Sequence, residues 1–116
     1  MKLKLYRDTA GDPRARGRGR GKVMAGFLES DLQDSPESAE EILRALRDVE
    51  AGREDSWDRT GNTYTLTLSL QGASLQNEMD EDAEPCAFSL AEVREAVEEW
   101  VSFLERPEGS RDRRAP

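Results

Sequence analysis

The residues of this 116-residue chain best suited to chemistry are carboxylates, and five of them gather in one stretch: Glu78, Asp80, Glu81, Asp82 and Glu84. Such a stretch can mimic a phosphate backbone and occupy the basic cleft of a partner protein, because complementary charge speeds the encounter. A solvated loop without a partner explains the same run, since charge runs usually only hold water. Calcium binding is disfavoured because the order of Asp, Gly and final Glu that defines an EF-hand loop is missing.

A second acidic set lies on both sides of a predicted helix, so the fold could bring it to the same edge as the acidic stretch. Tryptophan is enriched at the dominant positions of protein interfaces, which adds Trp57 to this set. The sequence therefore predicts one partner-binding surface from both sets. Its residues are Asp31, Asp34, Glu54, Asp55, Trp57, Asp58, Glu78, Asp80, Glu81, Asp82 and Glu84.

Basic residues are concentrated at the N-terminal end of the chain. Residues 1–22 hold eight Lys or Arg against two Asp, whereas residues 23–105 hold five basic and 21 acidic residues, within a net charge of −8. Arginine alternates with a small residue from Arg14 to Gly21, so an extended backbone would place four arginines on one face. Nucleic-acid binding is disfavoured, because no aromatic residues alternate with these arginines for base stacking. We expect the run to neutralise acidic groups of the protein or of a partner.

Missing residue types exclude several classes of site. The chain has no histidine and a single cysteine, Cys86, which excludes Ser-His-Asp and Cys-His triads, an internal disulfide and a cysteine-based zinc site. We therefore expect a binding protein without cofactor or metal rather than an enzyme. No run approaches the roughly 18 consecutive apolar residues of a membrane span. The first six residues are too short and polar for a secretory signal, so the cytosol is the expected location.

Hydrophobic spacing predicts a single α+β domain over residues 1–105, with residues 106–116 as a flexible tail. Alternation predicts strands at residues 2–6, 14–21 and 22–28, the second of them weakened by its glycines. A helix is expected from Ser35 to Gly52, because Ser-Pro-Glu is a typical helix start and glycine a typical end. Residues 55–78 are expected to form three antiparallel strands. A capping box formed by Ser89 and Glu92 predicts the last helix.

The predicted order is β-β-β-α-β-β-β-α, an antiparallel sheet of about six strands with two helices packed on it. Tyr64, Leu66, Leu68 and Leu70 are expected to face the core from the central strand. Trp100 lies in the apolar stripe of the last helix and is expected in the core. Phe103 falls off that stripe and is expected to be partly exposed.

Three stretches resemble the YacL-like family of small acidic bacterial proteins. They are residues 5–11 (LYRDTAG), residues 56–66 (SWDRTGNTYTL) and the final helix from Phe88 to Phe103. The central stretch is the most specific of the three. The Arg-Gly run and the long acidic stretch depart from the family pattern. The resemblance carries no enzymatic activity over to this chain.

The size and predicted shape also resemble immunity proteins of contact-dependent growth inhibition systems. That resemblance implies a cytosolic inhibitor that binds a basic, nuclease-type toxin C-terminal domain 1:1 and blocks its active cleft or an exosite. Two alternatives stay open: a YacL-like housekeeping protein with another partner, and an RNA-associated regulator that uses the arm from Arg14 to Arg20.

Overall fold

The computed structural model describes residues 1–106, so the predicted tail beyond Arg106 lies outside the described residues. The elements follow in the order β1 (Lys4–Arg7), β2 (Pro13–Arg16), α1 (Arg20–Phe27), a π-helical turn η1 (Leu28–Leu32), α2 (Pro36–Glu50), β3 (Ser56–Thr60), β4 (Tyr64–Ser69), β5 (Gly72–Asn77), β6 (Cys86–Phe88) and α3 (Leu90–Leu104). Strands β1 and β2 form a hairpin, and β3 to β6 form an antiparallel sheet in chain order.

The α+β class is confirmed for residues 1–106, and five of the six predicted strands are found, but the single sheet with two helices is wrong. The sixth strand found, β6, replaces the one predicted at residues 22–28. The strands divide into sheets of two and four, and there are three α-helices. The error lies in residues 22–28, predicted as a strand and found in α1. Met24, Phe27 and Leu28 are buried there, a spacing of three and four that belongs to a helix. Before α1, Gly19 turns the chain with a φ of 56°.

The two helices that the sequence predicts begin where their caps place them. Ser35 Oγ accepts a hydrogen bond from the backbone N–H of Ser38, at 3.2 Å, and Pro36 is the first residue of α2. At the start of α3, the Glu92 N–H donates to Ser89 Oγ (3.0 Å) and the Ser89 N–H donates to Glu92 Oε1 (2.9 Å). This reciprocal pair is the predicted capping box.

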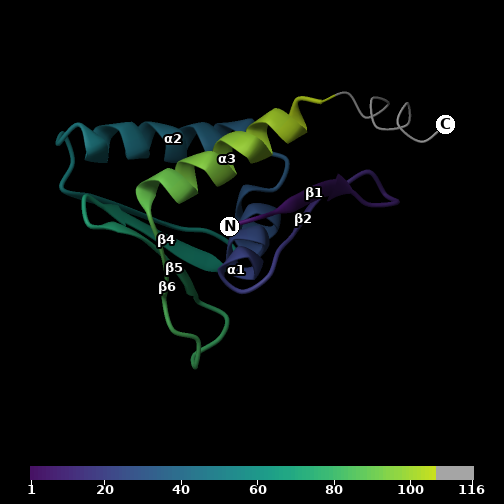
Figure 1. Cartoon of the computed structure of the whole chain (residues 1–116), viewed down its shortest axis with the longest axis horizontal. Coiled ribbons are helices and arrows are strands. Elements are labelled where there is room, and N and C mark those ends of the chain that lie inside the picture. Colours follow the sequence, from purple (N-terminus) through teal and green to yellow (C-terminus); the bar gives the residue numbers. More distant parts are fainter. Residues whose placement is uncertain (107–116) are drawn as a thin grey trace.

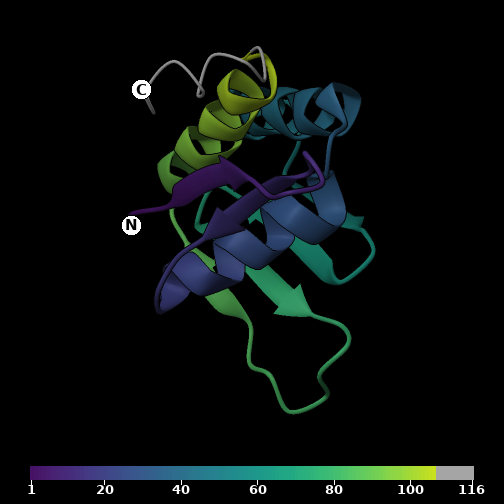
Figure 2. The same ribbon diagram turned by 90° about the vertical axis from the view of Figure 1, so that its right-hand side faces the viewer.

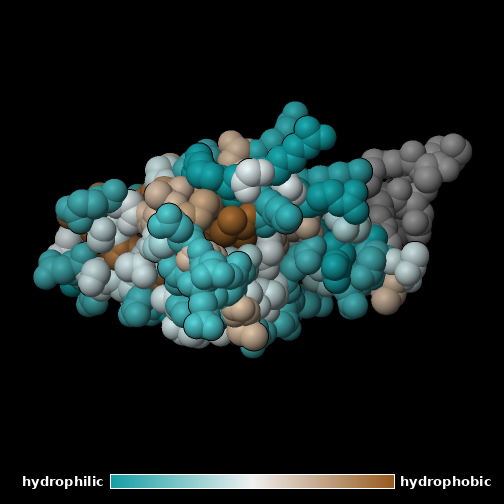
Figure 3. Space-filling model, turned by 90° about the horizontal axis from the view of Figure 1, so that it is seen from below, coloured by the Kyte–Doolittle hydropathy of each residue, from teal (hydrophilic) through white to brown (hydrophobic). Residues whose placement is uncertain are grey.

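The helices of residues 1–106 cover one face of the four-stranded sheet (Figure 1). Buried side chains of β4 and β5 point toward them, namely Tyr64, Leu66, Leu68, Ala73 and Leu75. The opposite face carries short polar residues such as Thr65, Thr67 and Ser74. From below, hydrophilic side chains dominate and hydrophobic ones form only small areas (Figure 3). Among residues 1–106, β3 and β6 are the unpaired edges of this sheet.

Two core predictions concerning single residues are wrong. Leu70 is 63% exposed, because β4 ends at Ser69 and Leu70 belongs to the turn before β5. Phe103 is only 5% exposed, because it packs beside Trp100 with 6.0 Å between ring centroids and the Arg7 guanidinium covers its ring. The hairpin that supplies Arg7 lies between α1 and α3 (Figure 2).

Trp100 is fully buried, as predicted, and joins α3 to the start of α2. Its indole Nε1–H donates to the backbone oxygen of Gln33, at 2.8 Å. Gln33 follows η1 and has a φ of 51°, so the chain reverses at this residue before α2 begins. The described residues contain no helix with the length and apolar character needed to cross a membrane.

An ion pair connects the first residue of α1 to α3. Arg20 Nη2 lies 2.8 Å from Glu92 Oε2, and its Nη1 donates to Glu92 Oε1 at 3.1 Å. The hydrogen bonds from Arg20 and from the Ser89 backbone lower the pKa of Glu92 to about 2, against an ordinary value of 4.5. Glu92 is therefore harder to protonate in the folded chain than in the unfolded chain.

Glu92→Gln is expected to be less stable than the wild type at pH 7. This margin, the difference in free energy of unfolding between the two proteins, is expected to narrow in acid. A carboxylate whose pKa is lowered on folding contributes stability above its unfolded pKa, and that stability is lost as the pH falls toward the folded value. Thermal unfolding of both proteins between pH 7 and pH 2.5 measures the margin. A margin that stays constant across this range would contradict the role of the ion pair.

Candidate functional site

The second acidic set of the sequence prediction is divided between the two ends of the four-stranded sheet. Asp31 lies beside Thr63, at the same end as the acidic stretch, whereas Glu54 and Asp55 lie at the other end. Ser56 pairs with Ser69, so Glu54 and Asp55 lie near the β4–β5 turn. Tyr64 pairs with Asn77, which places Glu78 at the other end, beside the β3–β4 turn. The structure therefore does not bring all residues of the predicted partner surface together at one end of the sheet.

The remaining members of the predicted surface differ in their exposure. Asp34 and Asp58 are exposed, whereas Trp57 is half-buried and packs against the core. Arg59, two residues along the same strand, pairs with Glu41 of α2 and so points to the helical face. Trp57 shares that face by strand alternation, which leaves only part of its ring for a partner.

Asp31 has a structural environment that the sequence did not reveal. It is 7% exposed, and its carboxylate accepts hydrogen bonds from the backbone N–H groups of Thr63 and Tyr64, both at 2.9 Å. The Ser30 hydroxyl donates to it at 2.7 Å. A Cβ on Gly61 would lie 2.6 Å from Asp31 Oδ2, so the turn needs glycine there. The structure thus removes Asp31 from the partner surface, because this carboxylate holds the β3–β4 turn against η1.

The acidic stretch forms the connection between β5 and β6, here called the acidic loop (residues 78–84). It projects away from the helices and the rest of the sheet (Figures 1 and 2). All five of its carboxylates belong to exposed residues. The ion pairs found within residues 1–106 involve none of them. Their charge is therefore directed to solvent in this part of the chain.

The acidic loop is nevertheless attached to the sheet at both ends. The Glu78 backbone N–H donates to the Thr63 carbonyl at 2.8 Å, and the Thr65 hydroxyl donates to Glu78 Oε2 at 2.7 Å. Near the other end, Gln76 Nε2 donates to the Ala83 carbonyl at 2.9 Å. Inside the loop, the Asp82 N–H donates to Asp80 Oδ1 at 3.0 Å. These bonds limit how far the carboxylates can spread.

The Arg-Gly run does not form a free arm. Arg14 and Arg16 belong to β2, and Arg20 begins α1. Arg14 pairs with Glu29 at 3.4 Å, and Arg20 pairs with Glu92. The expectation that the run neutralises acidic groups of the protein holds for these two arginines. Arg16 instead lies over the Tyr6 ring, 5.1 Å from its centroid, and donates to Tyr6 Oη at 3.2 Å.

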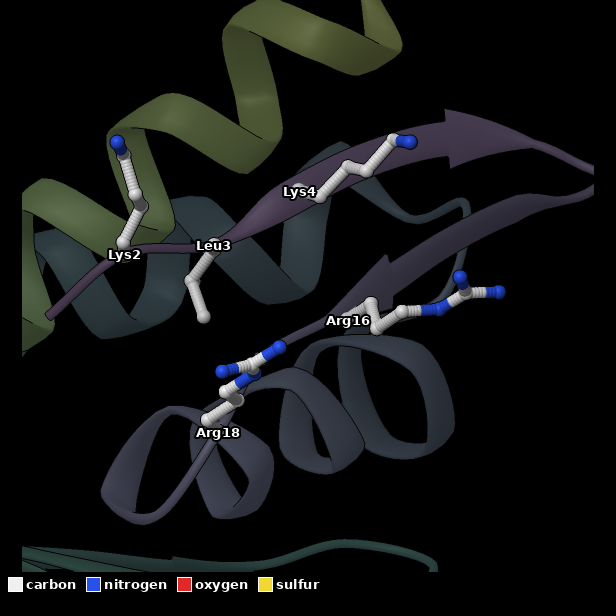
Figure 4. A pocket seen from close by; sticks show the side chains of 6 residues that line it. Lys2, Leu3, Lys4, Arg16 and Arg18 are labelled. Atoms are coloured by element: carbon white, nitrogen blue, oxygen red, sulfur yellow. The ribbon is translucent and has the colours of Figure 1, made fainter.

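A hollow of about 760 Å³ lies where the hairpin meets the start of α1, and we call it the basic hollow. Its lining residues are Lys2, Leu3, Lys4, Arg16, Gly17 and Arg18 (Figure 4). A second hollow of about 810 Å³ shares Arg16 and Gly17 with it and extends to Asp80 of the acidic loop. Sequence reasoning noticed both alternating charge patterns but missed that strand pairing brings them together.

Gly17 keeps the wall of the basic hollow free of a side chain. A Cβ at this position would lie 2.6 Å from the Gly21 carbonyl oxygen and 3.0 Å from Leu3 Cδ2. Because the first of these atoms is backbone, a larger residue would shift the connection between β2 and α1. Glycine at position 17 therefore permits the close packing of the β2–α1 connection beside the basic hollow.

The described residues carry two exposed concentrations of charge, one acidic and one basic. Residues 1–106 contain no group of three or more His, Cys, Asp or Glu placed to hold a metal ion. Cys86 is half-buried in β6. What the arrangement can do is attract charged partners, with the acidic loop and the basic hollow as its two exposed concentrations of charge. The fold and these surfaces define a small α+β protein whose charge is concentrated at two exposed places among residues 1–106.

Comparison with known proteins gives the family of this chain. The model of the "Uncharacterised protein family (UPF0231)" matches residues 1–98, so the chain belongs to the UPF0231 family. A UPF0231 protein of Shewanella sp. strain MR-4 is 26% identical over 100 residues, which cover 73% of this chain and 81% of the relative. One from Shewanella amazonensis is 27% identical over 98 residues, covering 72% and 79%. No solved structure matches.

These findings confirm the resemblance to the YacL-like family, which the UPF0231 relatives represent. The relatives named above are bacterial proteins. The second resemblance, to immunity proteins, receives no support from these relatives, because none of their names refers to immunity or to a toxin. That resemblance therefore enters only as part of a proposal.

Proposed function

We propose that this protein acts by stoichiometric binding, without chemistry of its own, and that its acidic loop docks into a basic cleft of a protein partner in the cytosol. The observation that carries the proposal is the state of the five loop carboxylates. They are exposed, they take part in none of the ion pairs within residues 1–106, and they project from the body of the molecule.

The attachment of the loop supports this role energetically. A loop without internal attachments would lose conformational entropy on binding, at a cost of about 0.5–1.5 kcal/mol for each immobilised side chain. The bonds from Gln76 to Ala83 and from Glu78 to Thr63 already restrict the loop backbone. Because the loop is already partly ordered, less of the favourable Coulomb energy with the partner is offset by lost conformational entropy.

In its most specific form, the proposal names the partner as a nuclease-type toxin domain of a contact-dependent growth inhibition system. A nuclease holds the phosphates of its substrate with lysine and arginine. Carboxylates in that cleft compete directly for the same cations and so block the substrate. Glu54, Asp55 and Trp57 lie at the far end of the sheet and would contact only a partner large enough to span it.

Reversing the loop charge is expected to slow association with a basic partner at least tenfold at low salt, because steering by complementary charge dominates the encounter rate. The test variant is Asp80→Lys/Glu81→Lys/Asp82→Lys. The matched control is Glu37→Lys/Glu40→Lys/Glu98→Lys, which changes the net charge equally on the helices. Stopped-flow association and calorimetry would use the C-terminal domain of a large secreted protein encoded beside this chain.

Equal effects of the two triple variants would show that only net charge matters and would remove the loop from the proposal. Absence of wild-type binding at micromolar concentration would overturn the toxin as partner. A growth defect on deletion in cells that hold no such toxin would instead favour the housekeeping alternative, with a basic protein of the same cell as partner.

A further inference from the structure

The basic hollow concentrates positive charge that the fold itself does not neutralise. Among residues 1–106, the ion pairs include none of Lys2, Lys4, Arg16 and Arg18. No carboxylate is among the six residues that line the hollow. Arg14 and Arg20, from the same stretch of chain, both have carboxylate partners. The hollow therefore differs from the rest of this basic segment.

The strand register adds an independent observation. Lys4 of β1 lies directly opposite Arg16 of β2, and Leu5 lies opposite the buried Ala15. Like charges directly opposite each other on neighbouring strands destabilise a sheet. A two-stranded hairpin has few other bonds to offset that cost. The register therefore places two like charges side by side on one face of the hairpin.

The positions of the charges indicate a polymer rather than a single ion. Figure 4 shows the charged ends of Lys2, Lys4, Arg16 and Arg18 spread around the opening instead of meeting at one point. Beyond Arg16, the second hollow continues the surface with Lys22 and the Tyr6 ring. A chain that carries one negative charge per unit would contact these cations in succession.

We propose that the basic hollow and the second hollow together bind a short segment of single-stranded nucleic acid through its phosphates. The aromatic ring that the sequence seemed to lack is supplied by Tyr6, which the hairpin places against Arg16. A positive groove with an aromatic or guanidinium plane for base stacking is the usual equipment for binding a single strand.

Two neighbouring acidic groups limit this surface. Asp80 and Glu29 both line the second hollow, so a phosphate beside either would be repelled and the path is limited to a few nucleotides; Glu29 is paired with Arg14, at 3.4 Å. On the other side, Glu92, Glu95 and Glu99 line a small hollow next to Met1 and Leu3, which weakens the contribution of Lys2. Lys4, Arg16 and Arg18 therefore carry the binding.

The experiment measures fluorescence anisotropy of labelled 12-nucleotide oligo(U) RNA and oligo(dT) DNA on titration with the full chain. We expect a dissociation constant on the order of 10 µM at 50 mM salt and a roughly twentyfold loss of affinity at 200 mM salt, as about three phosphate contacts require. Lys4→Gln/Arg16→Gln/Arg18→Gln is expected to lose at least tenfold in affinity at 50 mM salt. The matched control, Arg44→Gln/Arg47→Gln/Arg106→Gln, is expected to change it less than threefold.

Circular dichroism checks that the triple variant is folded, and the single variant Arg18→Gln, in the exposed connection before α1, serves if it is not. No anisotropy change with wild type at 100 µM would overturn the proposal, as would equal losses in the two triple variants. Binding of an oligoglutamate peptide as tight as that of the oligonucleotides would overturn the assignment to nucleic acid. The variants in this test leave the acidic loop unchanged and those of the proposed function leave Lys4, Arg16 and Arg18 unchanged, so the two proposals can fail separately.

Discussion

Trp100→Ala is expected to lower the free energy of unfolding by about 4 kcal/mol, which is a large part of the stability of a domain of this size. The side chain is fully buried, so its removal leaves a cavity between α2, α3 and the sheet that neighbouring side chains cannot fill without moving. The variant also leaves the Gln33 carbonyl without its indole donor. Urea denaturation followed by circular dichroism measures the change.

Trp100→Phe separates the two contributions. It keeps most of the apolar volume but removes the bond to Gln33, so the expected cost is about 1–2 kcal/mol in addition to a small packing loss. The Gln33 backbone has a φ of 51° and a ψ of −138°, outside the ordinary helical and strand regions. A loss below about 1.5 kcal/mol for Trp100→Ala would contradict the central place of this residue.

Asp31→Ala is expected to destabilise the fold by about 3 kcal/mol, because it leaves two N–H groups of the β3–β4 turn without an acceptor and each such group costs about 1–3 kcal/mol. Both donors, from Thr63 and Tyr64, lie at the junction of the sheet with η1. Asp31→Asn keeps one acceptor oxygen and is expected to fall between the alanine variant and the wild type. Urea denaturation measures all three proteins.

The matched control for Asp31 is Asp34→Ala, three residues further along the chain. Asp34 is exposed, and its removal is expected to change stability by less than about 0.5 kcal/mol. If both variants lost the same stability, the loss would reflect net charge rather than the bonds to the turn. This pair also separates structural carboxylates from those available to a partner.

Local signals predicted α2, α3 and the strands β3 to β5, because each of these elements is determined by residues close together in sequence. Ser35 and Ser89 begin their helices with their own side chains. β4 could be predicted because its alternating apolar and polar residues show directly which side chains face the core. The strand prediction for residues 22–28 was wrong because a short apolar run fits both the strand period of two and the helix period of 3.6. Only the burial of Met24, Phe27 and Leu28 decides between them.

The candidate surfaces were predictable only in part for a related reason. The exposure of the acidic loop follows from its composition and from the turn signals around it. The burial of Asp31 depends on the β3–β4 turn, which is 32 residues away in sequence, and no local pattern reports such a contact. The basic hollow likewise depends on the register that places Lys4 against Arg16.

The edge strand β3, which is unpaired within residues 1–106, affects the behaviour of the protein in mild acid. An unpaired edge presents backbone groups that can bond to a second copy, and charge keeps copies apart. The net charge is −8 at pH 7, but it vanishes near the isoelectric point of about 4.6 calculated from the sequence. The Arg20–Glu92 pair is still charged at that pH, since the pKa of Glu92 is about 2. As the pH falls, the repulsion between copies is therefore lost before the Arg20–Glu92 ion pair is. Molecules that are still folded can then associate through their β3 edges.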